Sequence, residues 1–307
     1  MAAAAGEPVE RRPAPFVVGV GRSGTTLLRL MLDAHPALAI PPETGFLADL
    51  RRASEEGRDS QADLVEVIAS HWRWDDYGLE RADVLERAEH HRAAGEACVQ
   101  AALRGFYEAY AARQDKPRWG DKTPVYVRRL RHVHHALPEA RFIHIYRDGR
   151  DVSLSRVNTL ALTDDVTMAK SARVWKRSIR RARRQGEKLG PELYAEVRYE
   201  SLVADPEPEL RRICEHIGLD FDPVMLAYHE RSAGRLAELD RDLPSRGTKP
   251  ERSAENRMAM HAAATRPPDE SMLGKWRTEM AAEDLVTFER IAGEVLEELG
   301  YPLAGDA

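Results

Sequence analysis

The sequence predicts an α/β fold of three layers, in which helices cover both faces of a parallel sheet. Residues 16–20 form an apolar run that leads into a glycine-rich turn and then into a helical pattern. Residues 140–146 repeat this order of strand and helix, and residues 193–197 form a third run of strand composition. Long segments with helical spacing separate these runs, and strands that alternate with helices usually pair in parallel.

Length and composition are those of one large domain, which we place at residues 14–307. The chain has 307 residues and 43% hydrophobic content, enough to fill a core. Residues 1–13 combine an alanine run with Glu, Arg and Pro, so we expect them to be disordered. They contain no long apolar core, so we expect no secretory signal, no membrane contact and a cytoplasmic location.

Net charge, cysteine positions and histidine spacing argue against a nucleic-acid partner, a disulfide and a metal site. The formal charge of −5 argues against nucleic acid as a partner. Cys98 and Cys214 stand far apart in helical patterns, so we expect two buried thiols rather than a disulfide. His132, His134 and His135 lack the spacing of a helical zinc pair, and we expect no metal. The sequence does not set the oligomeric state.

The turn after the first strand predicts an anion site. Its spacing is P-loop-like and nearly satisfies the pattern G-x-x-x-x-G-K-[ST], but Thr25 stands where the lysine belongs. Gly21 and Gly24 are expected to adopt backbone angles that let successive N–H groups point at a phosphate or sulfate. Arg22 adds a permanent cation. The candidate binding residues are Gly21, Arg22, Ser23, Gly24, Thr25 and Thr26.

A second anion site is predicted after the strand at residues 140–146. Arg147 at the strand end can bind a phosphate, and Ser155 offers a hydroxyl from the helix that follows. Two anion sites indicate a doubly phosphorylated ligand. The competing interpretation is a set of surface ion pairs among Arg147, Arg150, Asp148 and Asp151.

Together these two motifs resemble those of sulfotransferases. Residues 21–26 resemble the family's 5′-phosphosulfate loop, and Arg147 with Ser155 resembles its 3′-phosphate motif. The longer string at residues 21–36, followed by Pro-Glu-Thr at residues 42–44, is most similar to tyrosylprotein sulfotransferases and their bacterial relatives. The resemblance implies 3′-phosphoadenosine 5′-phosphosulfate (PAPS) as the sulfuryl donor, without a metal.

The resemblance also implies a role for individual residues. Arg22 matches the cation that binds the transferring group, Glu43 the general base, and Lys122 a lysine near the leaving phosphate. Tyr199 matches a tyrosine of the adenosine pocket, and Lys275 lies in a segment similar to the late loop that covers the cofactor.

Each role has a physical rationale or a competing interpretation. Fixed cations stabilise charge that grows during sulfuryl transfer. The apolar residues 38–42 are expected to raise the pKa of Glu43 by burial, and His71 is the alternative base. Glu43 could instead belong to a helix start, Lys122 could be a solvated charge beside Asp121, and Tyr199 could serve packing alone.

Three further segments lie outside the motifs. Residues 46–116 have helical spacing and are expected to form a helical insertion that roofs the acceptor side of the site. Residues 232–270, the candidate lid, are expected to form a long loop or a partly ordered lid. Residues 283–299 predict a final amphipathic helix. The basic run at residues 173–184 is a solvated helix face or an attraction for an anionic acceptor.

The sequence therefore predicts a sulfotransferase that moves a sulfuryl group in line from PAPS to a hydroxyl or phenol. The acceptor is a small molecule or a peptide tyrosine. The alternatives are a nucleotide-dependent phosphotransferase with a degenerate P-loop, which would require magnesium and ATP, and a non-catalytic nucleotide-binding module.

Overall fold

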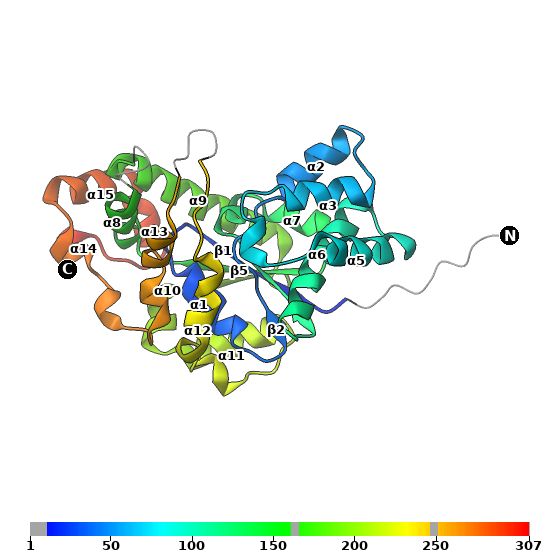
Figure 1. Cartoon of the computed structure of the whole chain (residues 1–307). Helices are drawn as coiled ribbons and strands as arrows, with labels where there is room; N and C mark the ends of the chain where they lie inside the picture. The colour runs from blue at the N-terminus through cyan, green and yellow to red at the C-terminus, as the bar shows by residue number, and fades with distance from the viewer. Residues whose placement is uncertain (1–10, 161–165, 246–250, 307) are drawn as a thin grey trace.

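A parallel sheet lies at the centre of the molecule, with helices on both sides (Figure 1). The computed structural model describes residues 11–160, 166–245 and 251–306. In these residues the main sheet has the order β4-β1-β5-β6, with every pair parallel. Its strands are β1 (Ala14–Gly19), β4 (Asp121–Lys122), β5 (Ala140–Tyr146) and β6 (Tyr194–Arg198). The predicted α/β fold is confirmed.

Strand β1 pairs with β4 on one side and with β5 on the other, and every one of its residues is buried. Its side chains alternate between the two faces of the sheet. Phe16 and Val18 pack into the core on the side of the insertion, whereas Val17 packs into the core on the side of helix α1 (Thr25–Asp33). An apolar strand buried on both faces, leading into a turn and a helix, is what the sequence predicts for this segment.

Helices that follow the sheet strands complete the layers. One core lies between the sheet and helices α1, α10 and α11, and another joins α8, α9 and α15. Residues 283–299 fall almost entirely within α15, as the amphipathic spacing predicts. The bounds are α7 (Leu130–Ala136), α8 (Gly149–Leu160), α9 (Met168–Leu189), α10 (Tyr199–Ala204), α11 (Pro206–His216), α12 (His229–Leu236), α14 (Trp276–Glu279) and α15 (Ala282–Glu298).

Residues 46–116 contain helices and lie together at one end of the molecule (Figure 1). Helices α5 and α6 approach closely at Gly105, where a Cβ atom would lie 2.7 Å from the backbone nitrogen of Ala88. A small two-stranded parallel sheet flanks this segment, formed by β2 (Leu38–Ala39) and β3 (Arg118–Trp119). The helices are α2 (Leu47–Glu55), α3 (Gln61–Ala69), α4 (Trp74–Tyr77), α5 (Arg81–Ala93) and α6 (Cys98–Arg113).

The candidate lid differs from the expected long loop. Its described residues contain part of α12, helix α13 (Ala254–Ala259) and several 3₁₀ turns, so the long-loop alternative is wrong for them and the partly ordered lid stays a prediction. The reason is that helices of six to eight residues are too short to produce a clear apolar period. Whether this segment moves as a lid stays a prediction. The expected disorder of residues 1–13 falls mostly on residues 1–10, which lie outside the described residues.

Both cysteines are free, as predicted. Cys214 is buried with its Sγ 3.8 Å from the sulfur of Met225, whereas Cys98 is half-buried. In the part of the chain that the structure describes, no helix combines the length and the apolar character needed to cross a membrane.

Candidate active site

The loop between β1 and α1 contains two residues with left-handed backbone conformations. Arg22 and Gly24 have positive φ angles of 79° and 92°. Gly21 does not, so the expectation that Gly21 supplies a left-handed angle is wrong, and Arg22 takes this conformation instead. The first turn of α1 then presents backbone N–H groups that have no partner within the helix.

Gly24 packs against Tyr199, whose ring also contacts the arginine of the second motif. A Cβ atom at Gly24 would lie 2.3 Å from Cδ2 of Tyr199, so only a glycine lets the loop pack against this ring. The guanidinium of Arg147 lies 4.6 Å from the centre of the same ring. Tyr199 thus separates the loop from the arginine of the second motif.

Arg22 crosses from the loop to two other elements. Its Nε donates to Oγ of Ser155 on α8 at 3.0 Å, and its Nη1 donates to the carbonyl of Met260 at 3.0 Å. Burial lowers the pKa of Arg22, and the charge of Arg147 lowers it further. Two guanidinium groups that repel one another in a shared site favour a bound anion.

Arg147 is buried and has unused hydrogen-bonding capacity. Its Nη2 donates to Asp151 at 3.1 Å and to the carbonyl of Met272 at 2.5 Å, but its buried Nε has no partner among the described residues. Arg150 is different, because it pairs with Asp148 at 2.8 Å and with Glu289 at 2.9 Å. Ion pairing therefore explains the burial of the Arg150 side chain, but it uses only part of the hydrogen-bonding capacity of Arg147.

Glu43 lies between two cations. Its carboxylate is 3.0 Å from Nζ of Lys122 and 3.4 Å from Nη2 of Arg73. Burial raises the pKa of Glu43, but the charges of Lys122 and Arg73 outweigh burial and hold the pKa well below its usual value. The expected upward shift from the apolar residues 38–42 is therefore wrong.

The competing interpretations of Glu43 and Lys122 are also wrong. Lys122 is only 3% exposed, so it is not a solvated charge, and burial lowers its pKa. Asp121 turns away from it and accepts hydrogen bonds from the hydroxyls of Thr44 and Tyr107 at 2.8 and 3.0 Å. The next helix, α2, begins only at residue 47 and has no side-chain cap.

A cavity of about 270 Å³ joins most of these groups. On one side are residues of the two motifs with Glu43, and on the other are residues of the candidate lid. Those from the sequence prediction are Gly21, Arg22, Gly24, Thr25, Thr26, Glu43, Arg147 and Tyr199, and those from the lid include Met260, His261, Ala264, Arg266, Pro267 and Asp269.

Some predicted residues lie outside this cavity wall. Ser23 is fully buried beneath the loop, and its hydroxyl has no hydrogen-bond partner in the part of the chain described. Ser155 and Lys122 do not line the cavity themselves. Ser155 accepts a hydrogen bond from Arg22, and Lys122 donates one to Glu43. Lys275 is half-buried, does not line the cavity and lies 3.9 Å from Glu279. His71 also lies elsewhere, with its ring against Phe46.

Sequence reasoning missed Arg73 and His261. Arg73 belongs to the helical insertion, and His261 lies in a segment with little periodicity. His261 Nδ1 is 3.3 Å from Oγ1 of Thr26, in the first turn of α1. The sequence carries no local pattern that would place either residue, because the contacts come from chain segments far from the motifs.

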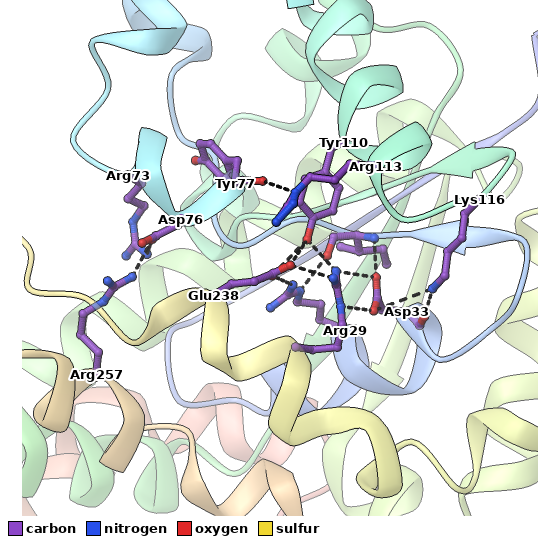
Figure 2. Close-up of polar contacts among 12 residues, drawn as sticks. Arg29, Asp33, Arg73, Asp76, Tyr77, Tyr110, Arg113, Lys116, Glu238 and Arg257 are labelled. Carbon is purple, nitrogen blue, oxygen red and sulfur yellow. Dashed lines mark hydrogen bonds and ion pairs between the residues drawn. The ribbon is translucent and has the colours of Figure 1, made fainter. Parts of the chain in front are cut away.

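A buried polar network anchors the candidate lid to α1 and to the insertion. Figure 2 shows Glu238 among Arg29, Tyr110 and neighbouring charges. Glu238 is 3.2 Å from Arg29 and accepts from the hydroxyl of Tyr110 at 2.9 Å, while Arg235 binds Asp33 at 2.7 Å. The lid segment is therefore tied to α1, the helix that follows the P-loop-like turn.

The basic run lies on α9 and is mainly a solvated face. Arg180 pairs with Glu294 at 2.7 Å, and Arg183 pairs with Glu196 at 2.8 Å. Other cations of this face border a groove of about 770 Å³, lined by Arg51, Arg131, His132, His135, Arg181, Arg184, Gln185 and Lys188. An attraction for anionic acceptors stays a prediction.

Fold and site together define an α/β protein in which a P-loop-like turn and a second cationic motif share one cavity. Residues 13–223 match the profile of the Sulfotransferase family. Because this match covers more than half of the chain, the protein belongs to the sulfotransferase family and is an enzyme of that family.

Similar proteins agree with this assignment. The chain is 27% identical over 293 residues to protein-tyrosine sulfotransferase A of Caenorhabditis elegans, covering 94% of this chain and 67% of that protein. It is also 27% identical over 317 residues to nodulation protein NoeE of Sinorhizobium fredii, covering 93% and 65%. The chain thus spans about two thirds of the length of these curated relatives.

Solved structures confirm the fold. The sulfotransferase domain of the Synechococcus PCC 7002 olefin synthase superposes with a TM-score of 0.58 at 24% identity, covering 96% of this chain and 98% of that domain. The sulfotransferase domain of the curacin biosynthetic pathway also gives a TM-score of 0.58, at 18% identity, covering 96% and 100%.

Proposed function

We propose that this protein transfers a sulfuryl group from PAPS to a hydroxyl or phenol by in-line transfer. The observation that carries the proposal is the shared cavity. Its wall includes Arg147, Glu43 and residues of the loop between β1 and α1, which we call the donor loop. A P-loop-like turn without its lysine, joined to a second cationic motif, suits a 3′,5′-substituted nucleotide better than a triphosphate.

The residues present fit such a donor. The loop with Arg22 would hold the 5′-phosphosulfate at the N-terminus of α1, and Arg147 would hold the 3′-phosphate. The buried Nε of Arg147 has no partner in the described chain, which leaves one strong donor for that phosphate. Tyr199 lies between the two positions and offers a ring face to the adenosine. When bound, the donor supplies an activated sulfuryl group.

The chain's cations would stabilise the transfer. Arg22 and Lys122 are fixed by their contacts with Ser155 and Glu43, so they need no reorganisation as charge grows on the sulfuryl and leaving oxygens. We assign Arg22 to the sulfuryl group and Lys122 to the leaving phosphate.

Glu43 is the proposed general base. It is ionised at neutral pH and therefore able to accept the acceptor's proton. A donor bound beside Lys122 and Arg73 would offset part of their charge and raise the pKa of Glu43, which makes the carboxylate a better base in the complex than in the free protein.

The helical insertion reaches the proposed base through Arg73, which lies 3.4 Å from Glu43. The proposed acceptor is either a small hydroxyl or phenol compound or a peptide tyrosine. Similarity to protein-tyrosine sulfotransferases supports the peptide, and similarity to a nodulation protein favours no single acceptor.

The test is sulfuryl transfer from sulfur-labelled PAPS to a panel of phenols, sugars and tyrosine peptides, without added metal. Label should move to at least one acceptor. Glu43→Gln should remove transfer while product binding is retained, and Arg22→Ala should remove transfer and weaken binding. Glu56→Gln, an exposed carboxylate on the insertion, is the matched control. Unchanged transfer in Glu43→Gln would contradict the base assignment.

A further inference from the structure

His261 lies at the donor loop although it belongs to the candidate lid. Its Nδ1 is 3.3 Å from Oγ1 of Thr26, and it lines the cavity with Glu43 and Arg22. The carbonyl of the preceding residue, Met260, accepts a hydrogen bond from Arg22. Two successive lid residues therefore contact the hydroxyl and the cation assigned to the donor's anionic end.

An ion-pair chain holds this part of the lid in place. Arg257 of α13 is 4% exposed, and its Nη2 donates to Asp76 at 2.6 Å. Asp76 is also 3.6 Å from Arg73, which in turn is 3.4 Å from Glu43. Figure 2 shows Arg257 pointing at Asp76, with Arg73 on the opposite side. The contacts connect the lid helix to the proposed base.

Positive charges surround His261 in the ligand-free protein. Burial lowers the pKa of His261 to about 3, with Lys122 the next cause, and Arg22 and Arg29 act in the same direction while Glu43 opposes them. Arg266 and Asp269 line the same cavity. The imidazole is thus neutral at pH 7. An anion bound in the loop would place negative charge among these cations and favour the imidazolium.

We propose that His261, positioned by the Arg257–Asp76 ion pair, contacts the 5′-phosphosulfate end of the donor and takes up one proton from solvent as the donor binds. This inference rests on the proposed function, because the anion is the donor's. The proton comes from water and stays on the ring, and no bond in the donor breaks. Protonated His261 then donates a hydrogen bond to a donor oxygen and adds a cation beside Arg22.

The test uses 3′-phosphoadenosine 5′-phosphate (PAP), the desulfated product, in calorimetric titrations at pH 7. Titration in two buffers of different ionisation enthalpy gives the number of protons bound with PAP. The wild-type protein should take up more protons than His261→Asn, which should also bind PAP about tenfold more weakly. Free PAP carries the same protons in both experiments, so a difference in proton number arises within the complex. His90→Asn, an exposed histidine on α5, should match the wild type.

Arg257 provides the positioning test. Arg257→Met should reduce proton uptake as His261→Asn does, and Arg257→Lys should restore part of it, whereas a merely structural role would leave the proton number unchanged. Equal proton numbers in the wild type and His261→Asn would overturn this inference while PAP binding still supported the proposed function. Failure of the wild type to bind PAP would overturn the proposed function itself.

Discussion

Gly24 meets two requirements at once, and this explains why the donor loop needs a glycine there. Its φ of 92° is unfavourable for any residue with a Cβ atom, and the ring of Tyr199 occupies the space where that atom would lie. Backbone conformation and packing against Tyr199 therefore both require glycine at position 24.

Gly24→Ala should therefore cost more than a change that only strains the backbone. Gly57 has a similar φ of 80°, but none of the described residues comes within 4 Å of the position that a Cβ atom would take there. Gly57→Ala should lower the free energy of unfolding by about 1 kcal/mol, and Gly24→Ala by about 3 kcal/mol. Urea unfolding of both variants measures the difference, and equal losses would contradict the packing role of Tyr199.

Arg147 should distinguish nucleotides by their 3′-phosphate. Arg147→Ala should weaken PAP binding about 10- to 100-fold, because a charged hydrogen bond contributes about 1.5–3 kcal/mol. AMP lacks the 3′-phosphate, so its affinity should change little. Calorimetric titration with both nucleotides provides the comparison, and an equal loss for AMP would assign Arg147 to another part of the ligand.

At the scale of elements, local sequence patterns predicted the strands and helices that local interactions stabilise. Strand β5 begins and ends where the strand composition predicts, at Ala140 and Tyr146, and α15 follows its amphipathic spacing. Arg73, His261 and the helices of the candidate lid were not predicted, because long-range contacts place them. The pKa of Glu43 was predicted in the wrong direction for the same reason, since Lys122 and Arg73 approach its carboxylate only through long-range contacts.

The anchor of the candidate lid should contribute to stability. Arg235→Met leaves the buried Asp33 without its closest cation among the described residues, so the free energy of unfolding should fall by about 3 kcal/mol. Arg211 pairs with Glu207 at 2.7 Å in an exposed position, so Arg211→Met should cost less than about 1 kcal/mol. Denaturant unfolding tests this pair, and similar losses would show that the anchor adds no more than a surface ion pair.

At the scale of the whole molecule, a buried carboxylate makes stability depend on pH. Asp121 joins the edge strand β4 to the insertion through Tyr107, and to the segment that precedes the insertion through Thr44. Burial raises the pKa of Asp121 to about 6, although hydrogen bonds from Thr44, Thr123 and Tyr107 oppose the shift. Because this pKa is above the unfolded value of 3.8, its stabilising contribution is complete below pH 3.8 and is lost as pH rises through 6.

Asp121→Asn should remove this dependence. When the pH is raised from 5 to 7, ionisation of Asp121 should lower the free energy of unfolding of the wild type by about 1 kcal/mol. The variant should lack that decrease, so the difference between the two proteins should change with pH. Urea unfolding at both pH values measures it. A constant difference would mean that Asp121 is ionised throughout this range.

We propose that one cavity binds a nucleotide through separate 5′ and 3′ anion sites. Calorimetric titration with PAP, with AMP and with ATP plus magnesium tests this proposal most directly. PAP should bind most tightly and need no magnesium, because only PAP engages both the loop between β1 and α1 and Arg147. Tighter binding of ATP with magnesium would overturn the proposal and favour a phosphotransferase.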